Sequence, residues 1–219
     1  MRLILASTSP RRRDLLALLG IPFDLQRPSF EERVVPGRSA VELVQEFAHE
    51  KARSVAEIDP EALVIGSDTM IELDGEILGK PCDLEEASTM LRRLAGRGHL
   101  VHTAVTVLCP TRRVDDTRLS SASVRMKPYD ADLHERYLAT QDSLGKAGGY
   151  SIQGGGADLI EALDGDYPTV VGLPLRVVAA QLCRAGLVSP VAIDQIYRHA
   201  EYQNWTHFRT GREPSARLQ

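Results

Sequence analysis

The sequence predicts an α/β fold, with one domain built around a mixed β-sheet that helices flank. Short apolar, β-branched stretches alternate with amphipathic helical stretches along the chain. Some neighbouring strands are separated by a helix, which is typical of parallel crossovers, and others by a two-residue turn, which is typical of antiparallel hairpins. No internal repeat and no long linker divides the 219 residues, so we expect a single domain.

The first predicted elements are a buried strand at Arg2–Ala6 and a helix at Pro10–Leu19. Ser9 is a suitable N-cap, and proline suits the first helical position because its missing N–H costs nothing there. Gly20 is expected to end the helix. A second strand is expected at Phe23–Gln26.

A capping box at Ser39 and Glu42 follows the loop Pro28–Arg38 and opens a helix that runs to about Glu57. The next predicted strand, Leu63–Gly66, is expected to end where the polar residues Ser67, Asp68 and Thr69 begin. An Asp-Gly turn at residues 74 and 75 then predicts a hairpin of Met70–Leu73 with Glu76–Leu78.

The second half of the chain alternates in the same way. We expect a helix from Asp83 to Gly96, paired strands at His99–Cys109 and Arg118–Lys127, a helix from Asp130 to Thr140, a glycine-rich loop at Gln141–Gly156, a hairpin at Ile160–Tyr167 around Asp164 and Gly165, and a helix at Pro174–Ala185. From Leu187 the chain is polar, with one weak helix after Ser189 and Pro190 and a frayed end beyond Thr210.

Composition and charge exclude several classes of protein. Hydrophobic residues make up 43% and the formal net charge is −4, which does not suit a protein built to bind a nucleic-acid polymer. No apolar run approaches the roughly 20 residues of a membrane span, and the N-terminus lacks the features of a signal peptide. The three cysteines have no paired spacing, so we expect reduced thiols in a cytoplasmic protein.

Three arginines lie where the first helix is expected to begin. Arg11, Arg12 and Arg13 follow a strand, Ser7 and the capping residue. Free backbone N–H groups and the positive end of the helix dipole favour an anion there, and we expect this anion to be a phosphate. The alternative is a solvated basic turn. On a helix, consecutive residues point about 100° apart, so Arg13 is the arginine least suited to join the other two.

Three further charged residues are candidates for chemistry. Asp68 follows a buried strand, where α/β proteins commonly place ligand-binding carboxylates, although it could instead form a turn. Lys80 lies between Gly79 and a proline, and Lys51 lies within the long helix. Either lysine could simply be a solvated or ion-paired surface residue.

The glycine-rich segment KAGGYSIQGGG contains Gln153, whose amide can both donate and accept hydrogen bonds. Its glycines let a backbone approach a ligand closely, although a flexible structural loop is an equally plausible interpretation. The segment fits neither a Walker-type phosphate loop nor a dinucleotide fingerprint. The six histidines show no metal-ligand spacing, and no nucleophilic triad is apparent.

Five collinear motifs resemble the Maf family of nucleoside triphosphate pyrophosphatases, from Leu3 to about Ala185. They are LASTSPRRRDLL, FAHEKAR, GSDTMIELDGEILGKP, HTAV and KAGGYSIQGGGADLIEALDGDYPTVVGLPL. The resemblance implies an elongated mixed sheet related to that of inosine triphosphate pyrophosphatases, in a domain of residues 1–186. Residues 187–219 form a polar extension with no assigned role.

The resemblance also implies a reaction: hydrolysis of a nucleoside triphosphate between its α- and β-phosphates, aided by Mg²⁺ or Mn²⁺. The form KAGGYSIQG is similar to the branch that acts on dTTP and UTP. Two alternatives stay open, namely a preference for a modified purine triphosphate and a non-catalytic, nucleotide-binding regulator of cell division. A homodimer is one assembly compatible with the sequence.

The residue pattern and the family resemblance together suggest a role for each candidate residue. By resemblance, Asp68 is the proton acceptor. Ser7 and the helix start would bind phosphate oxygens, and the triphosphate would be neutralised by Arg11, Arg12, Lys51 and Lys80. Glu31 or Glu32 would join Asp68 as a ligand of the divalent ion. Gln153 would pair with the N3–H edge of uracil or thymine, in a pocket near which the resemblance also places Thr69.

Overall fold

A computed structural model of the chain describes residues 1–35, 37–199, 202 and 204–208. It confirms the predicted mixed α/β fold, because the strands pair in both parallel and antiparallel fashion and helices lie between them. The chain forms two compact units. The first comprises Met1–Thr69, His102–Ser120 and Gly172–Ala200, and the second comprises Met70–Val101, Ser121–Val171 and Glu201–Gln219.

Three long strands contribute residues to both units. They are β3 (Leu63–Leu73), β5 (Gly98–Cys109) and β6 (Val114–Met126), with the 3-10 turn η1 (Pro110–Arg112) joining the last two. The boundary between the units falls inside each of these strands. The two units are therefore not consecutive segments of the sequence.

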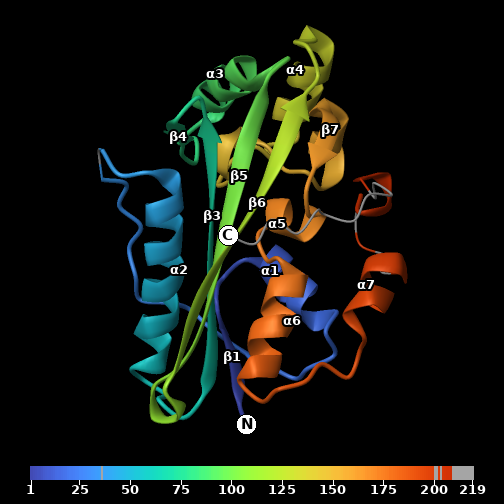
Figure 1. Ribbon diagram of the computed structural model, residues 1–219. Helices are drawn as coiled ribbons and strands as arrows, with labels where there is room; N and C mark the ends of the chain where they lie inside the picture. The colour runs from blue at the N-terminus through green and yellow to red at the C-terminus, as the bar shows by residue number, and fades with distance from the viewer. Residues whose placement is uncertain (36, 200–201, 203, 209–219) are drawn as a thin grey trace. The chain divides into compact units, whose positions relative to one another are not determined.

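In the first unit the strand order is β2-β1-β3-β5-β6. Strand β1 (Leu3–Ala6) pairs in parallel with β2 (Asp24–Gln26) and with β3. Parallel pairing needs a crossover, and here helix α1 (Pro10–Ala17) connects β1 to β2 and helix α2 (Ala40–Ala56) connects β2 to β3. Helix α2 covers one face of the unit's strands, and α1 and α6 (Leu175–Arg184) cover the other (Figure 1).

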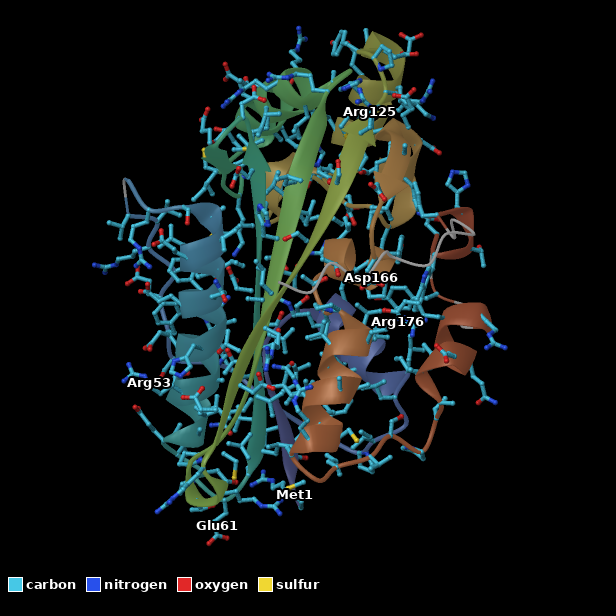
Figure 2. The ribbon with its side chains drawn as sticks, in the orientation of Figure 1. Met1, Arg53, Glu61, Arg125, Asp166 and Arg176 are labelled. Atoms are coloured by element: carbon cyan, nitrogen blue, oxygen red, sulfur yellow. The ribbon has the colours of Figure 1, made fainter. Side chains whose placement is uncertain are left out.

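Helix α2 packs very closely on β3 because of a glycine. A Cβ atom at Gly66 would lie 2.2 Å from the Ala48 carbonyl oxygen and 2.6 Å from the Ala52 backbone nitrogen. Around this contact a buried apolar cluster forms between α2 and the strands, made of Ile4, Ala6, Ala52, Val55, Ala56, Ala62, Val64 and Leu108. On the solvent side of α2, Arg53 projects outward (Figure 2).

In the second unit the strand order is β4-β3-β5-β6-β7. The predicted hairpin of β3 with β4 (Glu76–Leu78) is confirmed, since Ile71 lies opposite Leu78 and both turn residues have positive φ. Strand β7 (Ile160–Asp164) pairs antiparallel with β6, with an irregularity between Arg125 and Met126. Helix α3 (Leu84–Leu94) packs against helix α4 (Ala131–Ala139) and the 3-10 turn η2 (Ala147–Gly149), and the turn η3 (Gly154–Leu159) packs against α4 and β7.

Two boundary predictions were wrong. The strand expected at Leu63–Gly66 continues without a break to Leu73, because hydrogen bonds within the sheet region satisfy the polar groups that were expected to end it. The hairpin expected to reach Tyr167 does not form. Asp166 instead accepts hydrogen bonds from the Thr169 N–H and hydroxyl, and the short helix α5 (Tyr167–Val171) begins there.

The polar C-terminal segment is folded in the part that the structure describes. In the first unit, α7 (Ile193–His199) confirms the predicted weak helix, and Asp194 forms an ion pair with Arg176. In the second unit, the 3-10 turn η4 (Thr206–Phe208) follows Trp205, which is buried. The predicted frayed end beyond Thr210 lies outside the described residues. Within those residues, no helix has the length and apolar character needed to span a bilayer.

Candidate active site

A buried ion-pair cluster lies between α2 and β3 in the first unit. The Lys51 ammonium donates to Asp68 Oδ1 and to Glu32 Oε1, both at 2.5 Å. Lys51 and Asp68 are only 6% and 5% exposed, so their charges interact in a poorly solvated environment. Lys51 bonds to Oδ1 of the Asp68 carboxylate, and Oδ2 is not part of this contact.

Gly66 explains how these two charged groups meet. Asp68 lies two residues after Gly66 on β3, so both face α2. Lys51 lies one helical turn after Ala48, whose carbonyl oxygen is in contact range of Gly66. The absence of a side chain at Gly66 lets α2 approach until Lys51 reaches the carboxylate. Gly66 was not among the residues whose role the sequence predicted.

On the opposite face of β3, a second polar cluster is centred on Arg12. Its Nε donates to the Gly172 carbonyl at 2.9 Å, and its Nη2 donates to Thr69 Oγ1 at 3.1 Å. Thr69 Oγ1 also lies 3.0 Å from Thr103 Oγ1. The Gly172 carbonyl lies 3.0 Å from the Ser67 hydroxyl as well. Two directed hydrogen bonds therefore fix the orientation of the Arg12 guanidinium.

Arg12 connects the two clusters electrostatically. Burial lowers the pKa of its guanidinium, while the nearby carboxylates of Asp68 and Glu32 favour its charged form and Arg11 opposes it. Since an arginine remains protonated despite such shifts, the charge persists at neutral pH. A partly desolvated cation of this kind interacts strongly with a phosphate oxygen.

The start of α1 differs in one detail from the prediction. Ser9 makes no side-chain cap, and its N–H instead donates to Ser7 Oγ at 3.1 Å. Ser7 is buried directly after β1, and Pro10 occupies the first helical turn as expected. Ser9 is therefore the N-cap residue of α1, as the sequence predicted, but its side chain makes no capping hydrogen bond.

The three arginines of α1 have different environments. Arg11 and Arg12 are half-buried, whereas Arg13 is exposed and pairs with its neighbour Asp14 at 2.8 Å. The two acidic loop residues also differ. Glu31 pairs with Arg33 at the surface, whereas Glu32 reaches Lys51. The first unit thus brings together Arg11, Arg12, Glu32, Lys51, Asp68 and Thr69 around its two clusters.

Lys80 and Gln153 belong to the second unit. Lys80 is exposed and follows Gly79, whose carbonyl accepts a hydrogen bond from the Gly148 N–H at 2.9 Å. This bond connects the end of the β3–β4 hairpin to the glycine-rich loop. Gln153 is half-buried and immediately precedes η3.

The glycine-rich loop is tightly anchored within the second unit. Its Tyr150 hydroxyl lies 2.7 Å from His99 Nε2, and its Ser151 N–H donates to the Tyr137 hydroxyl at 3.0 Å. A Cβ atom at Gly156 would lie 2.0 Å from the Ser151 carbonyl oxygen, so the loop folds back on itself there. At this position the glycine serves packing rather than approach to a ligand.

Sequence reasoning missed two residues of the Arg12 cluster. Thr103 lies in the HTAV motif and Gly172 follows α5, far along the chain from Arg12. A Cβ atom at Gly172, which has φ of +120°, would lie 3.1 Å from Thr69 Oγ1 and 3.3 Å from Arg12 Nε. A glycine between two apolar segments gives no sequence signal for such a contact.

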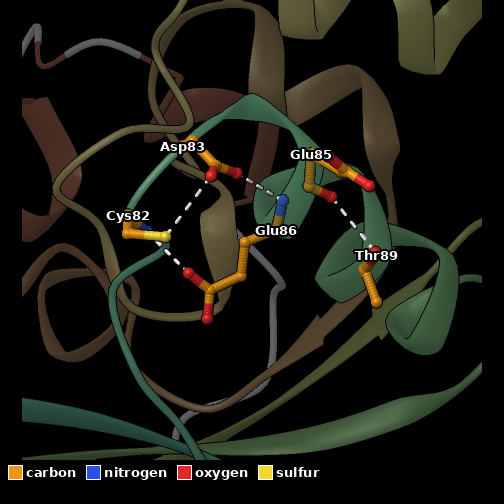
Figure 3. A pocket seen from close by; sticks show the side chains of 5 residues that line it. All are labelled: Cys82, Asp83, Glu85, Glu86 and Thr89. Atoms are coloured by element: carbon orange, nitrogen blue, oxygen red, sulfur yellow. Dashed lines mark hydrogen bonds between the residues drawn. The ribbon is translucent and has the colours of Figure 1, made fainter.

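A separate open pocket of about 410 Å³ is lined by Cys82, Asp83, Glu85, Glu86 and Thr89 (Figure 3). Its carboxylates serve the start of α3. Asp83 caps the Glu86 N–H at 2.8 Å, and Glu86 accepts from the Cys82 N–H at 2.7 Å. Hydrogen bonds to Glu86 and Asp83 raise the pKa of Cys82 to about 11, which keeps it a thiol at neutral pH. These groups are used in capping the helix, so we assign the pocket no ligand.

The chain is similar to known proteins over most of its length. A family model described as Maf-like protein matches residues 2–185. A dTTP/UTP pyrophosphatase of Bacillus velezensis is 47% identical over 174 residues, which cover 80% of this chain and 91% of that protein. A dTTP/UTP pyrophosphatase of Pelotomaculum thermopropionicum is 42% identical, with 84% and 96% covered. Among solved structures, the Ham1 protein of Staphylococcus aureus aligns with a TM-score of 0.44 and 15% identity over 91% of each chain.

Proposed function

Because the chain belongs to the Maf family, we propose that it hydrolyses dTTP and UTP to the nucleoside monophosphate and pyrophosphate. Relatives at 47% and 42% identity are named dTTP/UTP pyrophosphatase, and they align with this chain over nearly their whole length. We assign the activity to residues 1–186 and place the enzyme in the cytoplasm, acting on free nucleotides as a monomer or a homodimer. The observation that supports it best is the buried Asp68 carboxylate beside Lys51 and Arg12.

In this proposal, Asp68 is the general base. Water attacks the α-phosphorus, and Asp68 Oδ2 accepts its proton as the α–β phosphoanhydride bond breaks and pyrophosphate leaves. Lys51 holds Asp68 through Oδ1 at 2.5 Å and so orients the second oxygen. In this proposal Lys51 is a positioning residue for Asp68, whereas the sequence led us to expect that it neutralises the triphosphate.

The triphosphate is neutralised by the groups at the start of α1. Arg11, Arg12 and the backbone N–H groups of Arg11 and Arg12 in the first turn of α1 contact phosphate oxygens, and Thr69 holds Arg12 in place. Lys80 is assigned a phosphate contact on the family resemblance. Charge neutralisation and positioning are the main sources of rate in phosphoryl transfer, so no further nucleophile is required.

The same cluster fits a divalent cation. Asp68 and Glu32 bring two carboxylates together around Lys51 Nζ, which lies 2.5 Å from one oxygen of each, and these two carboxylates would hold the ion. Mg²⁺ is usually bound by one or two carboxylates together with substrate phosphates, and Mn²⁺ accepts similar ligands. No group of three acidic, histidine or cysteine ligands occurs in the part of the chain that the structure describes, so phosphate oxygens would complete the shell. When bound, the ion would supply positive charge that offsets the negative charge of the triphosphate.

Removal of the metal gives the corresponding prediction. EDTA should abolish pyrophosphate release, and excess Mg²⁺ or Mn²⁺ should restore it, while the circular dichroism spectrum stays unchanged. Full activity in EDTA would contradict the metal assignment.

Base selection is assigned to Gln153. Uracil and thymine present an N3–H donor beside carbonyl acceptors, and a glutamine amide offers the complementary pair. Cytosine reverses this pattern, so dTTP and UTP should be preferred over CTP. A mismatched, buried polar edge costs about 1–3 kcal/mol, which corresponds to a preference of about tenfold to a hundredfold.

The proposal is tested by product analysis with the wild type and Asp68→Asn. The wild type should release pyrophosphate and dTMP from dTTP. Asp68→Asn keeps the size of the side chain but removes the base, so kcat should fall about 10²–10⁴-fold while dTTP binding, measured by calorimetry, persists. Asp74→Asn is a matched control at an exposed turn position. Release of orthophosphate and dTDP, or near-normal turnover of folded Asp68→Asn, would contradict the proposal.

A further inference from the structure

We propose that Asn204, in the C-terminal extension beyond the family match, is a positioning residue for base selection. It lies outside residues 2–185, the range that the Maf-like model covers. It acts by holding the backbone on both sides of Gln153. The inference rests on the proposed function, because it assumes that Gln153 reads the base.

One amide nitrogen makes both contacts. Asn204 Nδ2 donates to the Ile152 carbonyl at 3.2 Å and to the Gly154 carbonyl at 3.0 Å. These carbonyls belong to the residues immediately before and after Gln153. The Gln153 N–H itself donates to Ser151 Oγ at 3.2 Å. The backbone around the glutamine is therefore held at three successive residues.

Without these two hydrogen bonds from Asn204, the backbone around Gln153 would be too mobile to orient the glutamine amide. Gly154 has a positive φ of 60°, and two more glycines follow it, so the segment has more conformational freedom than most loops. A glutamine amide that can move or rotate by 180° satisfies the uracil edge and the cytosine edge equally well. Discrimination between them requires that the amide be held in one orientation.

The position of Asn204 is itself fixed by its surroundings. Asn204 has a φ of 62°, in the left-handed region that asparagine tolerates better than most residues. The next residue, Trp205, is 3% exposed, and its ring stacks on Tyr167 at a centroid distance of 5.9 Å. Phe208 stacks on the same tyrosine at 5.9 Å. Aromatic packing of this kind fixes the position of the turn and therefore of the Asn204 amide.

The test measures the ratio of kcat/KM for dTTP to that for CTP. Asn204→Gly keeps the left-handed backbone and removes the amide. Asn204→Asp keeps the size but replaces the donor by a carboxylate, which repels the two carbonyl oxygens. Thr206→Ala is a matched control, because Thr206 is an exposed residue of the same turn. Each ratio comes from one preparation, so it does not depend on the folded fraction.

Both Asn204 variants should lower the ratio at least about threefold toward that of Gln153→Ala, while Thr206→Ala leaves it unchanged. In the Gln153→Ala background, Asn204→Gly should have no further effect on the ratio, because the two residues act as one unit. If Gln153→Ala lowers the ratio and the Asn204 variants do not, this inference alone is overturned. If Gln153→Ala leaves the ratio unchanged, the base-reading role falls and the inference falls with it.

Discussion

Asp68 and Thr69 are adjacent in sequence, yet their side chains serve different clusters. Asp68 bonds to Lys51 on the α2 face of β3, whereas Thr69 bonds to Arg12 and Thr103 on the other face. Successive residues of a strand alternate in this way. One strand therefore orients the proposed base on one face and the proposed phosphate-binding arginine on the other.

The hydrogen-bond geometry of Arg12 can be tested with a substitution that keeps the positive charge. Arg12→Lys retains the positive charge, but a single ammonium cannot reproduce the two directed bonds to the Gly172 carbonyl and Thr69 Oγ1. We expect kcat/KM for dTTP to fall about tenfold or more, as steady-state kinetics would show, since hydrogen bonds from charged groups contribute about 1.5–3 kcal/mol.

The neighbouring arginine provides the control. Arg13 is exposed and pairs with Asp14, so Arg13→Lys should change kcat/KM less than twofold. Equal losses in the two variants would show that the basic turn acts only through its total charge. The helical spacing predicted which arginine would point away, whereas the partners of Arg12 could not be predicted because they are distant in the chain.

At the scale of the element, the approach of α2 to β3 depends on Gly66. A methyl group there would lie 2.2 Å from the Ala48 carbonyl oxygen, which belongs to the helix backbone and cannot rotate away. Gly66→Ala should therefore push α2 outward. We expect a loss of about 1–3 kcal/mol in the free energy of unfolding, as for other overpacked cores, measured by urea denaturation.

An outward shift of α2 should also reduce the catalytic rate. Because Lys51 lies one turn along α2 from Ala48, Gly66→Ala should lower kcat as well as stability. Gly98→Ala is the matched control, since a Cβ atom at Gly98 meets nothing within 4 Å and the residue also lies in a strand. A Gly66→Ala protein as stable and active as Gly98→Ala would show that α2 does not position Lys51 in this way.

The elements also show which sequence signals were reliable. The capping box at Ser39 and the Asp-Gly hairpin were confirmed, because each depends on local interactions over a few residues. The polar run Ser67–Thr69 was misleading, since it predicted the end of a strand. The Ser67 hydroxyl lies 2.9 Å from the Ala104 carbonyl, and a partner 37 residues away is not visible in local sequence.

At the scale of the whole molecule, the mixed α/β class followed from the alternation of helical and apolar patterns. The candidate site could be predicted only in part. Lys51 and Asp68 were identified as separate candidates, but their pairing requires the register of α2 on β3. The contact of Ser67 with Gly172 spans 105 residues, and such long-range packing has no local signature.

Stability at acidic pH depends on a buried histidine of the second unit. His99 is 3% exposed, its Nε2 lies 2.7 Å from the Tyr150 hydroxyl, and burial lowers its pKa to about 4. The unfolded chain takes up a proton at this residue near pH 6.5, whereas the folded protein does so only near pH 4. The stabilisation is therefore fully present above pH 6.5 and is lost as the pH falls toward 4.

The expected slope is up to about 1.4 kcal/mol in the free energy of unfolding per pH unit between these two values. His99→Gln keeps a polar group for Tyr150 but cannot titrate, so urea denaturation from pH 7.5 to 4.5 should show a shallower decline in this variant. His207→Gln, at an exposed position, should retain the wild-type slope. Since the slope counts the protons that the two states bind, parallel curves for the wild type and His99→Gln would mean that His99 titrates alike in the folded and the unfolded chain.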